Sequence, residues 1–277
     1  MTGSINSPRI WGNSPIHVED AGQGEIVVLL HSSGMSGEQW RRTAEHLGRG
    51  GVRTIVPDLL GSGRSAPWPA GKPFGFLDDV EMVNQLLHRL GRPVHLVGHS
   101  YGGFIALRAA ALDPARVLSM ALYDPVAFGV LEPGVAADVE GLQDLERVRF
   151  GWGEADAERE AWLRDFVDYW GGEGAWSRLR DAARAEFSRV GWIVHEGARS
   201  LTGDLTRAAA YQSLQVPALL ITGEHSPPAA QRVVARLGEA LPGARVERIA
   251  GAGHMGPLTH GKVINELLAA HLAAVVA

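Results

Sequence analysis

The sequence predicts an α/β fold built on one mostly parallel β-sheet with helices on both faces. Short apolar runs of strand length alternate with segments of helical spacing, first over residues 26–123 and again over 218–274. Continuous apolar runs are typical of strands that are buried on both faces, as in parallel sheets. The 277 residues suffice for one large domain, and the 35 Gly and 15 Pro stay below the proportion that marks low-complexity chains.

The first half of the chain shows this alternation in regular order. Apolar runs predict strands at residues 26–33, 54–59, 94–98 and 117–123. Helical segments are predicted at residues 37–47, 76–90 and 101–112. The longest of these carries apolar residues at helical spacing and is followed by Gly91, a plausible helix C-cap. Strands alternating with helices in this way indicate a parallel sheet.

Residues 129–205 break the alternation. This segment reads as charged helices without strand-like runs, and it holds five of the eight Trp. The alternation then returns, with strands predicted at 218–223 and 244–249 and helices at 228–241 and 262–274. We therefore divide the chain into an α/β core of residues 1–128 and 206–277 and a helical cap of residues 129–205. The cap is expected over the carboxyl edge of the sheet.

Composition excludes several classes of function. The formal net charge is 26 − 31 = −5, and no basic stripe marks a nucleic-acid partner. The absence of Cys excludes disulfides, thiolate nucleophiles and Cys-ligated metals. No apolar stretch reaches the roughly 18 residues that span a bilayer, and the N-terminus has no signal-peptide pattern. We expect a cytoplasmic protein that acts on a small molecule, without a membrane partner, a metal or a cofactor; its oligomeric state stays open.

A nucleophile motif lies at one strand–helix junction. Gly98-His99-Ser100-Tyr101-Gly102 matches G-x-S-x-G between the apolar strand at 94–98 and the helix at 101–112. A sharp turn there needs small residues, because the backbone is crowded on both sides of the Ser. Such a turn exposes the hydroxyl at the carboxyl edge of the sheet, where open α/β folds bind ligands. Ser100 is therefore the candidate nucleophile.

Several motifs in order give the chain a wider resemblance. They are LLHSSG at 29–34, Trp40 in the following helix, PDLLGSGRS at 57–65, VGHSYGG at 97–103 and AGAGHMGP at 250–257. With these motifs the chain resembles the α/β-hydrolase superfamily from roughly residue 15 to 275, and it is most similar to capped serine hydrolases of the esterase type. The resemblance implies an α/β-hydrolase fold and a catalytic triad.

A Ser nucleophile needs a neighbouring imidazole that takes its proton. Of the eleven His, His254 follows the last predicted strand in a small-residue loop, where the resemblance places the base. His99 adjoins the nucleophile, but its side chain is expected to point away. His31 ends a strand and is expected to brace the following loop. We therefore select His254 as the base.

The carboxylate that orients the base has two candidates. Relatives most often carry it in G-x-x-D after the strand at 218–223, where this chain has Gly223-Glu224-His225-Ser226. Ser226 cannot supply the negative charge. Asp124 directly follows the strand at 117–123, which is expected beside the nucleophile strand, and some relatives place their acid there. We predict Asp124 as the acid, with Glu224 as the alternative.

The tetrahedral intermediate of acyl transfer needs hydrogen-bond donors for its oxyanion. The N–H of Tyr101 is one candidate, because it opens a helix whose dipole favours negative charge. The resemblance places the second donor in the loop after the strand at 26–33, where Ser33 occupies the matching position. Phe128, shortly after Asp124, is expected to line the substrate pocket.

These residues support one main hypothesis and two alternatives. The main hypothesis is a serine hydrolase that cleaves a carboxylic ester, lactone or thioester of a small, partly apolar substrate through an acyl-enzyme at Ser100. The same side chains also suit a hydrolase that breaks the C–C bond of a vinylogous diketone. A non-catalytic ligand-binding relative is the third reading, suggested by Ser226 in place of the usual acid. Dehalogenase and epoxide hydrolase chemistry is disfavoured, because those relatives carry Asp at the position of Ser100.

Overall fold

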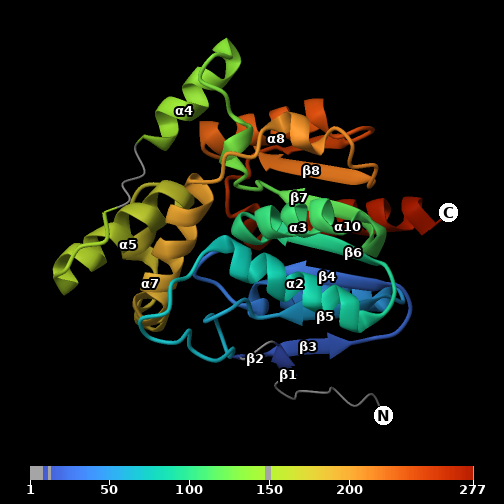
Figure 1. Cartoon of the computed structure of the whole chain (residues 1–277), viewed down its shortest axis with the longest axis horizontal. Coiled ribbons are helices and arrows are strands. Elements are labelled where there is room, and N and C mark those ends of the chain that lie inside the picture. The colour runs from blue at the N-terminus through green and yellow to red at the C-terminus, as the bar shows by residue number, and fades with distance from the viewer. Residues whose placement is uncertain (1–8, 12–13, 147–150, 277) are drawn as a thin grey trace.

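A seven-stranded sheet forms the centre of the molecule in a computed structural model that describes residues 9–11, 14–146 and 151–276 (Figure 1). The strand order is β3-β5-β4-β6-β7-β8-β9. The edge strand β3 runs antiparallel to β5, and all other neighbours pair in parallel. A separate two-stranded sheet joins β1 and β2. The strands are β1 Arg9–Trp11, β2 Ser14–Ile16, β3 Val18–Ala21, β4 Ile26–Leu30, β5 Arg53–Pro57, β6 Val94–His99, β7 Val117–Tyr123, β8 Ala218–Gly223 and β9 Arg245–Ile249.

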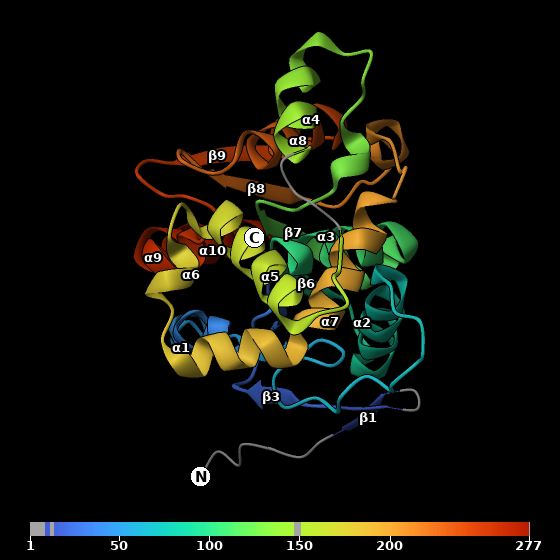
Figure 2. The same cartoon turned by 90° about the vertical axis from the view of Figure 1, so that its left-hand side faces the viewer.

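Helices follow the strands along the chain and cover both faces of the sheet. The α-helices are α1 Arg41–Arg49, α2 Phe76–Leu90, α3 Tyr101–Leu112, α4 Val139–Leu145, α5 Asp156–Gly171, α6 Ala175–Arg178, α7 Asp181–Thr202, α8 Pro228–Ala240, α9 Gly256–Thr259 and α10 Gly261–Val276. Helices α2, α3 and α8 lie on one face, while α1 and α10 lie on the other (Figures 1 and 2).

The two faces bury separate apolar cores. Successive side chains of a strand point to opposite faces, so β4 serves both cores although all five of its residues are buried. Its Ile26, Val28 and Leu30 belong to the core under α2, α3 and α8. Its Val27 and Leu29 belong to the core under α1 and α10. This two-sided burial explains the continuous apolar runs in the sequence.

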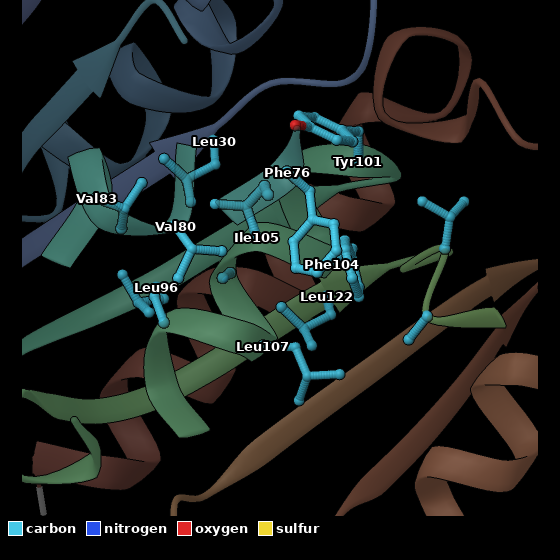
Figure 3. Packing of buried hydrophobic residues seen from close by; sticks show 14 of the residues in the cluster. Leu30, Phe76, Val80, Val83, Leu96, Tyr101, Phe104, Ile105, Leu107 and Leu122 are labelled. Carbon is cyan, nitrogen blue, oxygen red and sulfur yellow. The ribbon is translucent and has the colours of Figure 1, made fainter. Parts of the chain in front are cut away.

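The core beneath α2 and α3 holds the start of α3 in place. Figure 3 shows Val80 and Val83 of α2 and Ile105 of α3 packed toward the sheet residues Leu30 and Leu96. At the same end, the rings of Phe76 and Phe104 meet edge to face with their centroids 4.9 Å apart. This packing fixes the position of α3, and with it the Ser100 turn that precedes the helix.

The predicted α/β-hydrolase architecture is confirmed, with local differences. Helices α2 and α3 and strands β7 and β8 have the predicted bounds. The strand predicted at 26–33 ends at Leu30, because the chain bends at His31 into a loop held by side-chain hydrogen bonds. The antiparallel strand β3 was not predicted. Its sequence VEDA has only one fully buried residue, Val18, so it lacks the apolar run of the central strands.

The described part of residues 129–205 is helical. Helices α5 and α7 lie beyond the carboxyl ends of the parallel strands (Figure 1). Helix α4 packs on α8, where buried Asp138 pairs with Arg232 at 2.5 Å. The bounds of the cap remain a prediction. None of the described helices combines the length and the apolar character needed to cross a membrane.

Candidate active site

Ser100 occupies a strained turn between β6 and α3. Its φ of 54° and ψ of −118° cost a residue with a side chain about 1–3 kcal/mol. Two glycines permit the turn. A Cβ on Gly98 would lie 2.5 Å from the carbonyl oxygen of Gly102, and a Cβ on Gly102 would lie 2.4 Å from the carbonyl oxygens of Leu30 and His31. The G-x-S-x-G spacing therefore reflects close backbone packing around the Ser.

His254 lies in the loop between β9 and α9, with its ring almost fully buried. Its Nδ1 is 3.1 Å from Oδ2 of Asp124. Its carbonyl oxygen accepts a 2.8 Å hydrogen bond from Nε2 of His99. Because His99 immediately precedes Ser100, this bond holds the His254 loop beside the nucleophile turn.

The structure brings Asp124, and not Glu224, to the His254 ring. Asp124 follows β7 with a φ of 43° and is fully buried. Besides facing His254, its Oδ2 accepts a 2.5 Å hydrogen bond from the hydroxyl of Ser226. Glu224 accepts a 2.8 Å hydrogen bond from the N–H of Gly251, which lowers the pKa of the Glu224 carboxyl. Glu224 is thus engaged by the loop before His254.

The two predicted oxyanion donors come from different segments, Ser33 from the loop after β4 and Tyr101 from the start of α3. Ser33 lines the same small cavity as Ser100. Tyr101 is the first residue of α3, so its N–H has no partner within the helix. Positive helix-dipole charge is concentrated at that end. Ser33 thus shares a cavity lining with Ser100, and Tyr101 is the neighbour of Ser100 in the chain. Their role as oxyanion donors stays a prediction.

A hydrogen-bond network braces the Ser33 loop. The Oε1 of Gln39 accepts bonds from the N–H and the hydroxyl of Ser32, at 3.0 and 3.1 Å, and its Nε2 donates to Nδ1 of His99 at 3.1 Å. His31 donates from Nδ1 to the Ser32 carbonyl and accepts at Nε2 from the N–H of Leu59. Burial lowers the pKa of both His31 and His99, consistent with neutral rings that each use one donor and one acceptor.

The side chain of Tyr101 joins a buried carboxyl group. Its hydroxyl donates a 2.9 Å hydrogen bond to Oδ2 of Asp79, whose Oδ1 accepts from the N–H of Leu60 at 3.0 Å. Burial raises the pKa of Asp79 to about 7 and raises the pKa of Tyr101. These bonds tie the start of α3 to α2 and to the loop after β5.

Two spaces adjoin the candidate residues. The inner cavity contains Ser33 and Ser100 in its lining, and its volume is about 20 Å³. Predicted Phe128 also lines it. The outer cleft has a volume of about 530 Å³ and reaches His254. Trp170 of α5 lines both spaces, and its ring centroid lies 4.2 Å from that of the His254 ring.

Sequence reasoning missed three contributors to the site. Trp170 is one of five Trp in the predicted cap, and no local pattern separates it from packing residues. Gln39 is a polar residue that is only 7% exposed, and its role depends on partners that follow from the fold. Ser226 marks the missing acid in the sequence, but its bond to Asp124 depends on the pairing of β7 with β8.

The described residues offer no metal centre. Across the parts of the chain that the structure describes, no group of three or more His, Asp or Glu side chains could hold a metal ion. His225 and His260 line the outer cleft without forming such a group.

Comparisons with known proteins give relatives of several activities. A lipase of Mycobacterium tuberculosis is 40% identical over 100 residues, which is 36% of each chain. The chain thus matches about a third of that relative's length. The (E)-2-((N-methylformamido)methylene)succinate hydrolase of Acinetobacter baylyi is 25% identical over 95% of this chain and 96% of its own.

Solved structures share the fold over nearly the whole chain. A 2-hydroxy-6-oxo-6-phenylhexa-2,4-dienoate hydrolase from Rhodococcus superposes with a TM-score of 0.76 at 20% identity, covering 99% of this chain and all of the other. A thermophilic esterase from Thermogutta terrifontis gives 0.72 at 20% identity and covers 99% of both chains. The family model described as alpha/beta hydrolase fold matches residues 25–261. The chain therefore belongs to the α/β-hydrolase family.

Proposed function

We propose that this protein is a serine hydrolase that cleaves a carboxylic ester, lactone or thioester of a small, partly apolar substrate through an acyl-enzyme at Ser100. The observation that carries the proposal is the contact between His254 and buried Asp124 beside the strained Ser100 turn. A carboxylate facing Nδ1 favours the tautomer that carries its proton there, which leaves Nε2 free to accept one.

In the acylation step, Nε2 of His254 takes the Ser100 proton as Oγ bonds to the substrate carbonyl carbon. The carbonyl electron pair moves onto oxygen, and the N–H groups of Ser33 and Tyr101 stabilise the resulting oxyanion. When the carbonyl re-forms, the C–O bond to the alcohol breaks, and His254 returns the proton to that leaving oxygen. The ester is thereby split into an alcohol and an acyl-Ser100.

In the deacylation step, His254 removes a proton from water as the water oxygen attacks the acyl carbon. The second tetrahedral intermediate collapses, Ser100 regains its proton from His254, and the acid is released. Asp124 faces Nδ1 of His254 and stabilises the imidazolium that forms twice in each turnover. Helices α5 and α7 of the predicted cap lie beyond the carboxyl ends of the strands, on the side where these steps take place.

Ester hydrolysis by matched Ser variants tests the proposal. Wild-type protein should hydrolyse p-nitrophenyl acetate with a burst, and Ser100→Ala should lower kcat about 10⁴-fold or more. Ser213→Ala, on an exposed position, is the control and should keep wild-type rates. Equal rates for wild type and Ser100→Ala would contradict the proposal. A kcat/KM for a dienol-diketone far above that for every ester would favour C–C hydrolysis instead. This alternative is suggested by a relative from Burkholderia cepacia that is named 2-hydroxy-6-oxo-6-phenylhexa-2,4-dienoate hydrolase.

A further inference from the structure

The site is divided by one side chain. Ser100 lines the inner cavity, His254 lines the outer cleft, and Trp170 stands in the lining of both. From this division we infer the substrate class: esters that join a short acyl group to a larger alcohol bearing a cationic or uncharged polar group. Trp170 is the residue that limits acyl length. The inference rests on the proposed function.

The chemistry of acyl transfer assigns one part of the ester to each space. The acyl carbon must reach Ser100 with its oxygen near the N–H groups of Ser33 and Tyr101, so the acyl chain lies in the inner cavity. The leaving alcohol must receive its proton from His254, so it lies on the side of that ring. The outer cleft is the space that His254 borders.

The size and walls of the inner cavity select a short acyl chain. A volume of about 20 Å³ holds roughly one water-sized group. Its wall at Trp170 is held by other rings: Phe128 stacks on Trp170 with centroids 6.3 Å apart, Tyr169 meets it edge-on at 4.7 Å, and His254 lies at 4.2 Å. A long acyl chain would have to displace this cluster, whereas an acetyl group demands little movement.

The outer cleft has the opposite character. Its volume of about 530 Å³ falls in the range of small-molecule sites, and three carboxylate residues line it: Asp144, Asp168 and Glu173. Among its lining residues in the described part of the chain there is neither Lys nor Arg. Tyr169 and Trp170 also line the cleft. A cationic alcohol is therefore favoured there, and an anionic one is disfavoured.

Wild-type selectivity tests both halves of the inference. Acetate and octanoate esters of one neutral alcohol should differ in kcat/KM by about 100-fold in favour of acetate, because each added methylene meets a filled wall. The acetyl ester of 2-(trimethylammonio)ethanol should exceed that of 2-sulfoethanol by about tenfold at low salt, and the difference should shrink at high salt. A preference for the octanoate ester would overturn the claim of a short acyl group. A preference for the ester of 2-sulfoethanol would overturn the claim that the cleft disfavours an anionic alcohol.

Two Trp variants test the role of the wall. Trp170→Ala should raise the octanoate-to-acetate ratio of kcat/KM about tenfold or more, and Trp170→Phe should raise it less. Trp192→Ala, at a position that is 38% exposed on α7 and lines neither space, should leave the ratio unchanged. If Trp170→Ala folds and its octanoate-to-acetate ratio of kcat/KM is unchanged, Trp170 does not limit acyl length. The wild-type ester series is measured independently of these variants. It therefore decides the substrate class even if Trp170→Ala fails to fold.

Labelling of Ser100 separates this inference from the proposed function. A small fluorophosphonate that modifies Ser100, together with hydrolysis of some ester, upholds the proposed function whichever ester is preferred. In that case a preference for long acyl chains defeats the inference alone. Absence of both labelling and ester hydrolysis defeats the two together.

Discussion

The Ser226 hydroxyl lies 2.5 Å from Oδ2 of Asp124, the same oxygen that faces Nδ1 of His254 at 3.1 Å. Ser226 follows β8 and Asp124 follows β7, and these strands pair in parallel with Tyr123 opposite Ile221. Two neighbouring strand ends therefore converge on one imidazole. At the end of β8, the uncharged Ser226 donates a hydrogen bond to the Asp124 carboxyl group at the end of β7.

The identity of the acid is tested by paired amide substitutions. Asp124→Asn should lower kcat about 10³- to 10⁴-fold, because an amide no longer favours the productive tautomer or the imidazolium of His254. Glu224→Gln should keep kcat within about threefold of the wild-type value. Glu224 accepts a hydrogen bond from the Gly251 N–H and is more exposed to solvent than Asp124. Steady-state ester hydrolysis measures both. A loss confined to Glu224→Gln would reverse the assignment.

The convergence of the two strand ends predicts a rescue. In the Asp124→Asn background, Ser226→Asp should restore kcat at least about tenfold, because a carboxylate would again lie beside His254. Asp124→Asn with Ser226→Ala is the matched control and should show no recovery. If the Ser226→Asp double variant folds, as judged by circular dichroism, and gains nothing, the two positions are not equivalent sources of charge.

Much of this arrangement follows from local sequence patterns. Continuous apolar runs predict β7 and β8, and the glycines around Ser100 predict the sharp turn, because both depend on neighbouring residues. The choice between Asp124 and Glu224 depends instead on where each side chain points after its strand. That direction is set by tertiary partners, the Gly251 N–H for Glu224 and the Ser226 hydroxyl for Asp124.

Trp170 shows the same limit more strongly. Its spacing within the predicted cap matches that of ordinary packing residues. Its contact with His254 depends on how α5 crosses the carboxyl ends of the strands, and helical periodicity carries no information about that crossing. The sequence predicts the core that positions Ser100 better than it predicts the surface that faces the substrate.

Close packing at the nucleophile turn predicts intolerance of one methyl group. Gly102→Ala would place Cβ 2.4 Å from two backbone carbonyl oxygens, which cannot move as a flexible side chain could. We expect a loss of about 3 kcal/mol or more in the free energy of unfolding, or failure to fold. Gly134→Ala, whose added Cβ meets nothing within 4 Å, is the control and should stay within about 0.5 kcal/mol of wild type. Urea unfolding measures both, and a mild effect of Gly102→Ala would argue against the tight turn.

Buried Asp79 predicts a pH dependence of stability. Burial raises its pKa from 3.8 to about 7, so between those values the folded chain holds a proton that the unfolded chain has released. The contribution of Asp79 to the free energy of unfolding therefore falls as pH rises from about 4 to 7. The total fall is at most about 4 kcal/mol, and the contribution is constant above about pH 7.

Asp79→Asn isolates this contribution, because its side chain does not titrate. Urea unfolding at pH 4.5 and pH 7.5 should show that the variant gains stability relative to wild type as pH increases. The comparison at two pH values cancels the fixed effect of altered bonds to Tyr101 and Leu60. A difference between variant and wild type that is the same at both pH values would show that Asp79 titrates normally.

The central claim is that His254 and Asp124 make Ser100 a nucleophile, and covalent labelling measures this most directly. Wild-type protein treated with a small fluorophosphonate should carry one adduct, located at Ser100 by peptide mass spectrometry. In His254→Ala the labelling rate should fall at least about 100-fold, since the hydroxyl loses its base. Wild-type protein that stays unmodified, carries its adduct on another residue, or reacts at the same rate without His254 would contradict the account.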